Sequence, residues 1–100
     1  MNRNELDALL RETLGSANVY FQPPESVRLR FPCIVYSLEN QNDIPADDRQ
    51  YRRIKRYSLT YITKDPDDPM ANTLDDLRYC SMNRTFTSDN LHHFVYTIFY

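Results

Sequence analysis

The sequence predicts a single domain over residues 1–100, of the α+β class. We expect a mainly antiparallel sheet of four or five strands, with two helices packed on it and a long projecting hairpin. Three observations lead to this prediction. A chain of 100 residues supports one domain with a small core. Its 8 Tyr and 5 Phe, without any Trp, favour strands over a helical bundle. Segments of helical and of alternating apolar spacing follow one another along the chain.

The first predicted element is a helix over residues 4–15. Its leucines repeat at helical spacing and form one apolar stripe that suits packing on a sheet: Leu6, Leu9, Leu10 and Leu14. Asn4 is a suitable N-cap, and Gly15 ends the helix. A short strand is predicted at residues 18–21. Residues 26–31 alternate between apolar and polar side chains, which predicts either a strand or an extended lead-in to the next one.

The middle of the chain carries the longest predicted strand. Residues 33–38 are almost continuously apolar, which is typical of a strand covered on both faces. The polar residues 39–50 predict a long connection. Residues 51–63 then alternate, and one face of that strand carries Tyr57, Leu59 and Tyr61. Because a strand of this length outruns a small sheet, we expect it to form, with the connection before it, a hairpin around residues 39–55 that projects from the body.

The last third of the chain predicts a helix and a hairpin. Asp68 is a good N-cap, and Pro69 suits the first position of a helix. The buried stripe of that helix is formed by Met70, Leu74 and Leu77. Two strands at residues 82–87 and 91–100 follow, joined by a turn at residues 88–90.

Composition and motifs exclude several classes of function. The single glycine rules out Gly-rich phosphate loops and the G-x-S-x-G elbow of hydrolases. The net charge of -2 disfavours a dedicated nucleic-acid binder. We expect no membrane span, because no apolar run approaches the ~20 residues that a span needs. We expect no signal peptide, because charged residues interrupt the leucines of the N-terminal segment. Cys33 and Cys80 form no zinc pattern and indicate an intracellular, reducing place of assembly. We therefore expect a protein that is not an enzyme and binds no cofactor.

Two groups of residues invite a metal-binding or catalytic interpretation. His92 and His93 are neighbours on a strand and point to opposite faces, and neither has a third ligand at a recognisable spacing. Cys80 with one of these histidines is a candidate nucleophile, and a small enzyme of this kind predicts a lowered pKa of the Cys80 thiol. The acidic run at residues 65–68 lacks the Gly and the Glu of a calcium loop, and a helix-entry turn explains it better.

The charge pattern of residues 39–56 is the most informative feature. Four acidic residues are followed by five basic ones. Either this segment is a solvated loop and strand, or the basic edge of one subunit meets the acidic loop of the next in a closed ring. Contact of the arginines with phosphate ranks last, since the carboxylates repel DNA. The candidate subunit-interface residues are Glu39, Asp43, Asp47, Asp48, Arg49, Arg52, Arg53, Lys55 and Arg56. No catalytic, cofactor-binding or metal-binding residue is assigned.

Three segments carry a resemblance to a known family: VYFQPPESVRLRFPCIVYSL, YSLTYITKDPDDPM and YCSMNRTFTSDNLHHFVYTIFY. They resemble tail terminators, the small tail-completion or head–tail joining proteins of long-tailed bacteriophages, and are closest to those from phages of Gram-positive bacteria. The resemblance runs from about Val19 to Tyr100. It is best in the strand at residues 32–36 and in the turn at residues 89–91 with the aromatic strand after it.

The resemblance implies a structural virion protein. Members of the family form a hexameric ring that caps the head-proximal end of the tail tube, ends tube polymerisation and joins the tail to the head connector. The implied partners are other copies of the chain, the tail tube protein and the connector or stopper protein. DNA is met only in transit through the lumen, and no membrane is involved. Assembly takes place in the host cytoplasm, and the final location is the virion tail.

Three alternatives stay open. The first is a head-side connector ring, a stopper or an adaptor, although adaptors are mostly helical and stoppers mostly barrel-like. The second is the small enzyme that uses Cys80. The third is a binding module that stays monomeric at high concentration.

Overall fold

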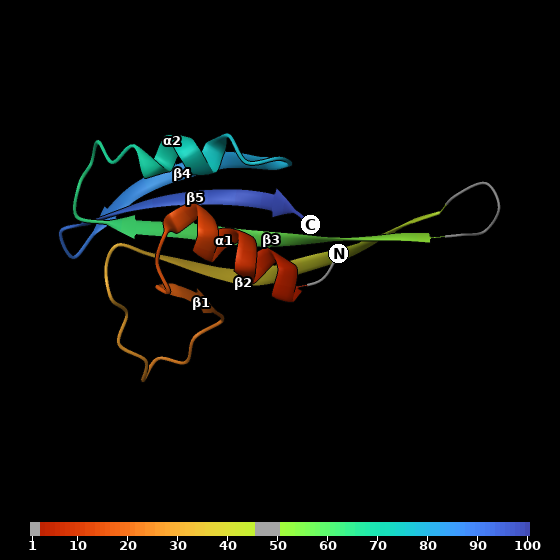
Figure 1. Ribbon diagram of the computed structural model, residues 1–100, viewed down its shortest axis with the longest axis horizontal. Coiled ribbons are helices and arrows are strands. Elements are labelled where there is room, and N and C mark those ends of the chain that lie inside the picture. Colours follow the sequence, from red (N-terminus) through yellow and green to blue (C-terminus); the bar gives the residue numbers. More distant parts are fainter. Residues whose placement is uncertain (1–2, 46–50) are drawn as a thin grey trace.

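The computed structural model of the chain describes residues 3–45 and 51–100, and for residues 40–45 and 51–54 it describes the backbone. In these ranges the elements are, in order, α1 (Arg3–Leu14), β1 (Val19–Phe21), β2 (Cys33–Pro45), β3 (Tyr51–Thr63), α2 (Met70–Asp75), β4 (Cys80–Ser88) and β5 (Leu91–Phe99). The five strands form one sheet in the order β1-β2-β3-β5-β4 (Figure 1). With its two helices this is an α+β fold, as the sequence predicts.

The sheet is mixed. Three neighbouring pairs, β2–β3, β3–β5 and β4–β5, are antiparallel, whereas β1 runs parallel to β2. A parallel pair needs a connection that carries the chain back to the start of its neighbour. Residues 22–32 are that connection, and residues 26–31 within it form no strand. They are therefore a lead-in to β2, one of the two possibilities left open by their alternation.

Strand β2 is longer than predicted. It continues to Pro45 and pairs with β3 as far as the partners Pro45 and Tyr51, with one irregularity between Leu38 and Asn40. The prediction that residues 39–50 are a connection is therefore wrong for residues 39–45. Strand pairing joins backbone groups and requires no apolar side chain, so a polar stretch can extend a strand.

Tyrosine hydroxyls fix both helices to the same face of the sheet. Tyr36 and Tyr96 lie on that face in register, each opposite Leu59 of the strand between them. The Tyr36 hydroxyl donates to a carboxylate oxygen of Asp7 in α1, at 2.6 Å. The Tyr96 hydroxyl donates to the carbonyl oxygen of Ala71 in α2, at 2.8 Å. The tyrosines thus bury their rings in the core while each phenol keeps a hydrogen-bond partner.

Asp68 collects three donors at the entrance to α2. Its carboxylate accepts hydrogen bonds from the hydroxyls of Tyr61 and Thr63, at 2.6 and 2.9 Å, and from the backbone N–H of Met70, at 2.9 Å. Pro69 between them already has helical angles, so the regular helix begins at Met70 while Asp68 satisfies an N–H of its first turn. Asp68 fills the capping role that the sequence predicts.

Helix α1 ends as predicted and begins earlier. Gly15 has a φ of 71°, and the backbone N–H groups of Gly15 and Ser16 both donate to the carbonyl oxygen of Arg11. Glycine adopts this left-handed conformation at little cost, which makes it a common helix terminator. The predicted cap at Asn4 is wrong, because Asn4 lies inside the helix, which includes Arg3.

The core lies between the helices and one face of the sheet. Its centre consists of Leu6, Leu10, Val19, Ile34, Tyr36, Tyr57, Leu59, Tyr61, Leu74, Tyr96 and Ile98. The predicted face of β3 contributes to it, as do Leu6, Leu10 and Leu74 of the predicted helix stripes, and Leu14, Met70 and Leu77 pack against it. Leu9 of the first stripe is not among these residues, and Leu77 lies beyond the end of α2.

Candidate assembly surface

Six of the nine candidate interface residues lie in the β2–β3 pair. Asp47, Asp48 and Arg49 lie outside the described residues. Asp43 lies in β2, and Arg52 and Arg53 lie in β3; the structure describes the backbone of these three residues. Glu39, Lys55 and Arg56 are described with their side chains. The structure thus assigns most of the set to one two-stranded ribbon.

Opposite charges meet within this ribbon. The register makes Asp43 and Arg53 direct partners on neighbouring strands. At the base of the ribbon Arg56 Nε lies 3.2 Å from Glu39 Oε2, and each side chain is 41% exposed. The Nε–H is not aligned with that oxygen and makes no hydrogen bond, although the atom itself is buried. Two of the acidic residues are therefore neighbours of basic residues in the same chain, which accounts for part of the pattern without a second subunit.

The outer part of the ribbon, residues 40–45 and 51–54, is here called the arm. β1 pairs with β2 at residues 34–36, and β5 pairs with β3 from Arg56 onward. Lys55 exchanges two backbone hydrogen bonds with Tyr100, which is the last contact of β3 on that side. Among the described residues, the two strands of the arm pair with each other alone, and Figure 1 shows them extending away from the helices. An isolated pair of strands is marginally stable in water.

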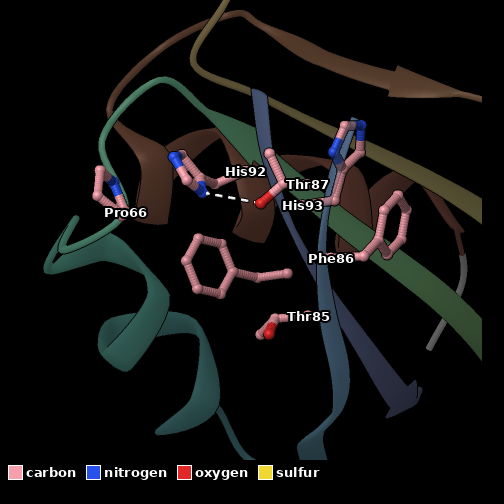
Figure 2. Close-up of a pocket in the computed structure, with 7 residues that line it drawn as sticks. Pro66, Thr85, Phe86, Thr87, His92 and His93 are labelled. Carbon is pink, nitrogen blue, oxygen red and sulfur yellow. Dashed lines mark hydrogen bonds between the residues drawn. The ribbon is translucent and has the colours of Figure 1, made fainter. Parts of the chain in front are cut away.

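A shallow hollow of about 230 Å³ lies at the other end of the sheet, beside the β4–β5 turn. It is lined by Pro66, Thr85, Phe86, Thr87, His92, His93 and Phe94 (Figure 2). The register places Thr85, Thr87, His92 and Phe94 on the face of the sheet that carries the helices. His92 Nδ1 lies 3.3 Å from the Thr87 hydroxyl, drawn as the dashed line in Figure 2.

The two histidines are on opposite faces, as adjacent strand residues are expected to be. His93 is paired with Phe86, and their rings stack with centroids 4.5 Å apart. Its Nδ1 lies 3.1 Å from the carbonyl oxygen of Leu91. In the described part of the chain, no group of three or more His, Cys, Asp or Glu side chains is placed to hold a metal ion.

The pKa values of both cysteine thiols are raised, whereas a nucleophilic cysteine needs a lowered pKa. Burial raises the pKa of the Cys33 thiol to about 11. Burial, and the nearby charge of Asp75, raise the pKa of Cys80 to about 11 as well. A reactive thiol requires a lowered pKa, since the thiolate is the attacking species. The small-enzyme alternative predicted such a lowered pKa at Cys80, and that prediction is wrong.

The exposed edge of β4 is a feature that the sequence-based reasoning missed. The sequence predicts the strand itself, but not that it is the last in the sheet, with β5 as its neighbour. Every residue of β4 after Cys80 is exposed. The available signal was polarity: Ser81, Asn83, Arg84 and three further hydroxyl residues are unusual for a strand inside a sheet.

Comparison of the sequence with known protein families gives no match, and comparison with curated proteins finds no similar protein. Within the described residues, no helix has the length and apolar character that crossing a membrane requires.

Proposed function

We propose that this protein is a tail terminator: a structural virion protein that forms a ring on the head-proximal end of a phage tail tube. The ring ends tube polymerisation and joins the tail to the head connector. The protein acts without catalysis or a cofactor, is assembled in the host cytoplasm, and meets DNA as it passes through the lumen. Hexameric symmetry is part of the proposal and follows from the resemblance of residues 19–100 to that family.

The arm is the observation that supports an assembly role most strongly. As part of this proposal, the arm is a long hairpin that projects from a mainly antiparallel sheet. Among the described residues its two strands pair with each other alone, so their outer backbone edges are open. Since such a ribbon is marginally stable alone, a neighbouring molecule is the natural source of its order. A contact that joins an arm to a different surface on the next copy is heterologous, and heterologous contacts form a ring when the rotation between copies closes.

Binding to isolated phage parts tests this function. The purified chain is added to tail tubes and, separately, to DNA-filled heads of the phage that carries the gene, and both are viewed by negative-stain electron microscopy. We expect a ring at one end of each tube and no further growth when tube protein is added. Rings on heads instead of tubes would make it a head-side connector. A chain that binds neither and sediments as a monomer would contradict both roles.

A further inference from the structure

We propose that β4 is the surface that receives the arm of a second copy of this chain. The arm adds to the free edge of β4 at residues 83–88, so that the sheet of one subunit continues into the ribbon of the next. This inference rests on the proposed function, because it assigns the contact that builds the ring.

The hairpin turn determines which backbone groups of β4 point outward. Asp89 and Asn90 both have positive φ, at 52° and 63°, as in the two-residue turn that closes on a hydrogen-bonded pair. That closing pair is Ser88 with Leu91. Hydrogen-bonded and non-bonded pairs alternate along antiparallel strands, so the N–H and C=O groups of Thr85 and Thr87 point away from β5. They are the donors and acceptors that an added strand uses.

The rest of this edge is already closed from within the chain. The N–H of Met82, which also points outward, donates to Asp75 Oδ1 at 3.1 Å. The N–H of Cys80 donates to the carbonyl oxygen of Leu77 at 3.1 Å. The open stretch is therefore residues 83–88, which is long enough to receive residues 51–54, the β3 strand of the arm. The other edge of the sheet, β1, has 3 residues and is too short to receive it.

The hollow supplies a place for a side chain of the added strand. Thr85, Thr87 and Phe94 line it. Alternate residues of a strand added to β4 project toward this face, and pockets for alternate side chains give strand addition its specificity. The ring of Phe94 with Pro66 suits an aliphatic side chain, and the arm has Ile44 and Ile54 in its sequence.

Charge favours the arm as the occupant. Pro66 in the hollow lies between Asp65 and Asp67, and the turn that ends β4 contains Asp89; all three carboxylates are on exposed residues. The basic residues nearby are Lys64 in that loop and Arg84 in β4, whose guanidinium lies over the Phe86 ring on the opposite face of the sheet. The β3 strand of the arm contributes Arg52 and Arg53. An acidic rim that receives a basic strand sets partner choice and orientation, whereas pairing of two arms through β3 would bring like charges together.

Proline at position 85 removes one docking donor and leaves the fold intact. The Thr85 N–H takes no part in pairing with β5, and proline is tolerated on edge strands at such positions. We expect Thr85→Pro to lose the oligomer in sedimentation velocity at concentrations where the unsubstituted chain assembles, with an unchanged circular dichroism spectrum. Thr85→Val keeps the N–H and is expected to assemble normally. A second variant, Asp67→Lys, changes a charge beside the hollow without removing a backbone N–H, and we expect it to weaken assembly severalfold. Asp76→Lys makes the same charge change at another exposed residue and is the control, which is expected to assemble normally.

Mixing two defective variants distinguishes this contact from arm-to-arm pairing. Arg52→Glu with Arg53→Glu impairs the arm, and Thr85→Pro impairs the edge, so neither variant assembles alone. Together they retain one intact arm and one intact edge, and we expect a dimer of one copy of each. If the unsubstituted chain forms rings and Thr85→Pro forms them equally well, strand addition at β4 is wrong while the ring-forming function stands. If the unsubstituted chain stays monomeric, the proposed function fails and this contact fails with it.

Discussion

Strand β3 passes through two different environments. From Arg56 to Thr63 it lies between β2 and β5 and places Tyr57, Leu59 and Tyr61 in the core, each at most 2% exposed. In the arm, its one partner among the residues that the structure describes is β2. The inner half of β3 is ordered by burial and by neighbouring strands on both sides. The outer half forms its backbone hydrogen bonds with a single strand, β2. The difference teaches that one continuous strand can be held by the core at one end and by a single neighbouring strand at the other.

The largest expected effect of a single substitution is in the body. Leu74 in α2 is 1% exposed in the core, so Leu74→Ala removes apolar contacts and leaves a cavity. We expect a loss of roughly 2 to 5 kcal/mol in the free energy of unfolding, measured by urea melts. Leu38 at the base of the arm is 41% exposed. Leu38→Ala is the matched control, and an equal loss there would contradict the division between body and arm.

Removing the carboxylate of Asp68 is expected to cost less. Asp68→Ala deprives the first turn of α2 of a cap and leaves the hydroxyls of Tyr61 and Thr63 without this acceptor. A lost cap and lost hydrogen bonds of this kind add to about 2 to 3 kcal/mol. Asp65→Ala is the comparison, because the exposed Asp65 side chain accepts one bond, from the Asp67 N–H at 2.9 Å. Chemical denaturation that ranks the two variants in reverse order would show that Asp68 does not hold α2 in place.

Stability should fall in acid because of two carboxylates in the body. Burial alone raises the pKa of Asp68, but hydrogen bonds from Tyr61, Met70 and Thr63 outweigh it and lower the pKa below its ordinary value of 3.8. Burial likewise raises the pKa of Asp7, and its bonds from Tyr36 and Arg11 lower it further than burial raises it. A lowered pKa in the folded state means that the stabilisation is complete above the unfolded pKa and is lost as the pH falls through the folded one.

The matching measurement is the free energy of unfolding between about pH 6 and about pH 2. We expect it to decrease below the ordinary carboxyl pKa. In Asp7→Asn with Asp68→Asn the decrease should be shallower, since an amide does not titrate. Curves of the same slope for both proteins would assign the acid sensitivity to other carboxylates.

The smallest effect is expected at the base of the arm. Glu39 and Arg56 are 3.2 Å apart, but both side chains are substantially exposed and the Nε–H is not aligned with the carboxylate. Exposed ion pairs contribute little, so Glu39→Gln should change the free energy of unfolding by less than about 0.5 kcal/mol. A thermal melt of this variant that shows a loss comparable to Asp68→Ala would mean that the ribbon is part of the cooperative body.

Patterns that depend on neighbours in the chain were predictable from the sequence. The leucine stripe of α1, its end at Gly15, the alternation of β3 and the turn between β4 and β5 all follow from local spacing or from residue types with local preferences. Contacts between distant residues were not. The bond from Tyr36 to Asp7 spans 29 positions and that from Tyr96 to Ala71 spans 25, and either phenol has many other possible partners in an unfolded chain.

The candidate surface was predicted only where its signal lies in neighbouring residues of the chain. The charge pattern marked residues 39–56 because it is local. The extension of β2 to Pro45 was missed, because its polar residues resemble a loop and its order comes from pairing with β3. The parallel β1 and the open edge of β4 follow from the order of strands in the sheet, which no periodicity in a single segment encodes.

Hydrogen exchange of the full chain, followed by mass spectrometry below and above the concentration of assembly, tests the central claim most directly. In the dilute protein, peptides covering the arm should exchange quickly and those covering the inner half of β3 slowly. On assembly, we expect the arm and residues 83–88 of β4 to gain protection together, while the body stays unchanged. An arm that is already as protected as the body in the monomer, or an assembly that protects neither the arm nor β4, would contradict the account.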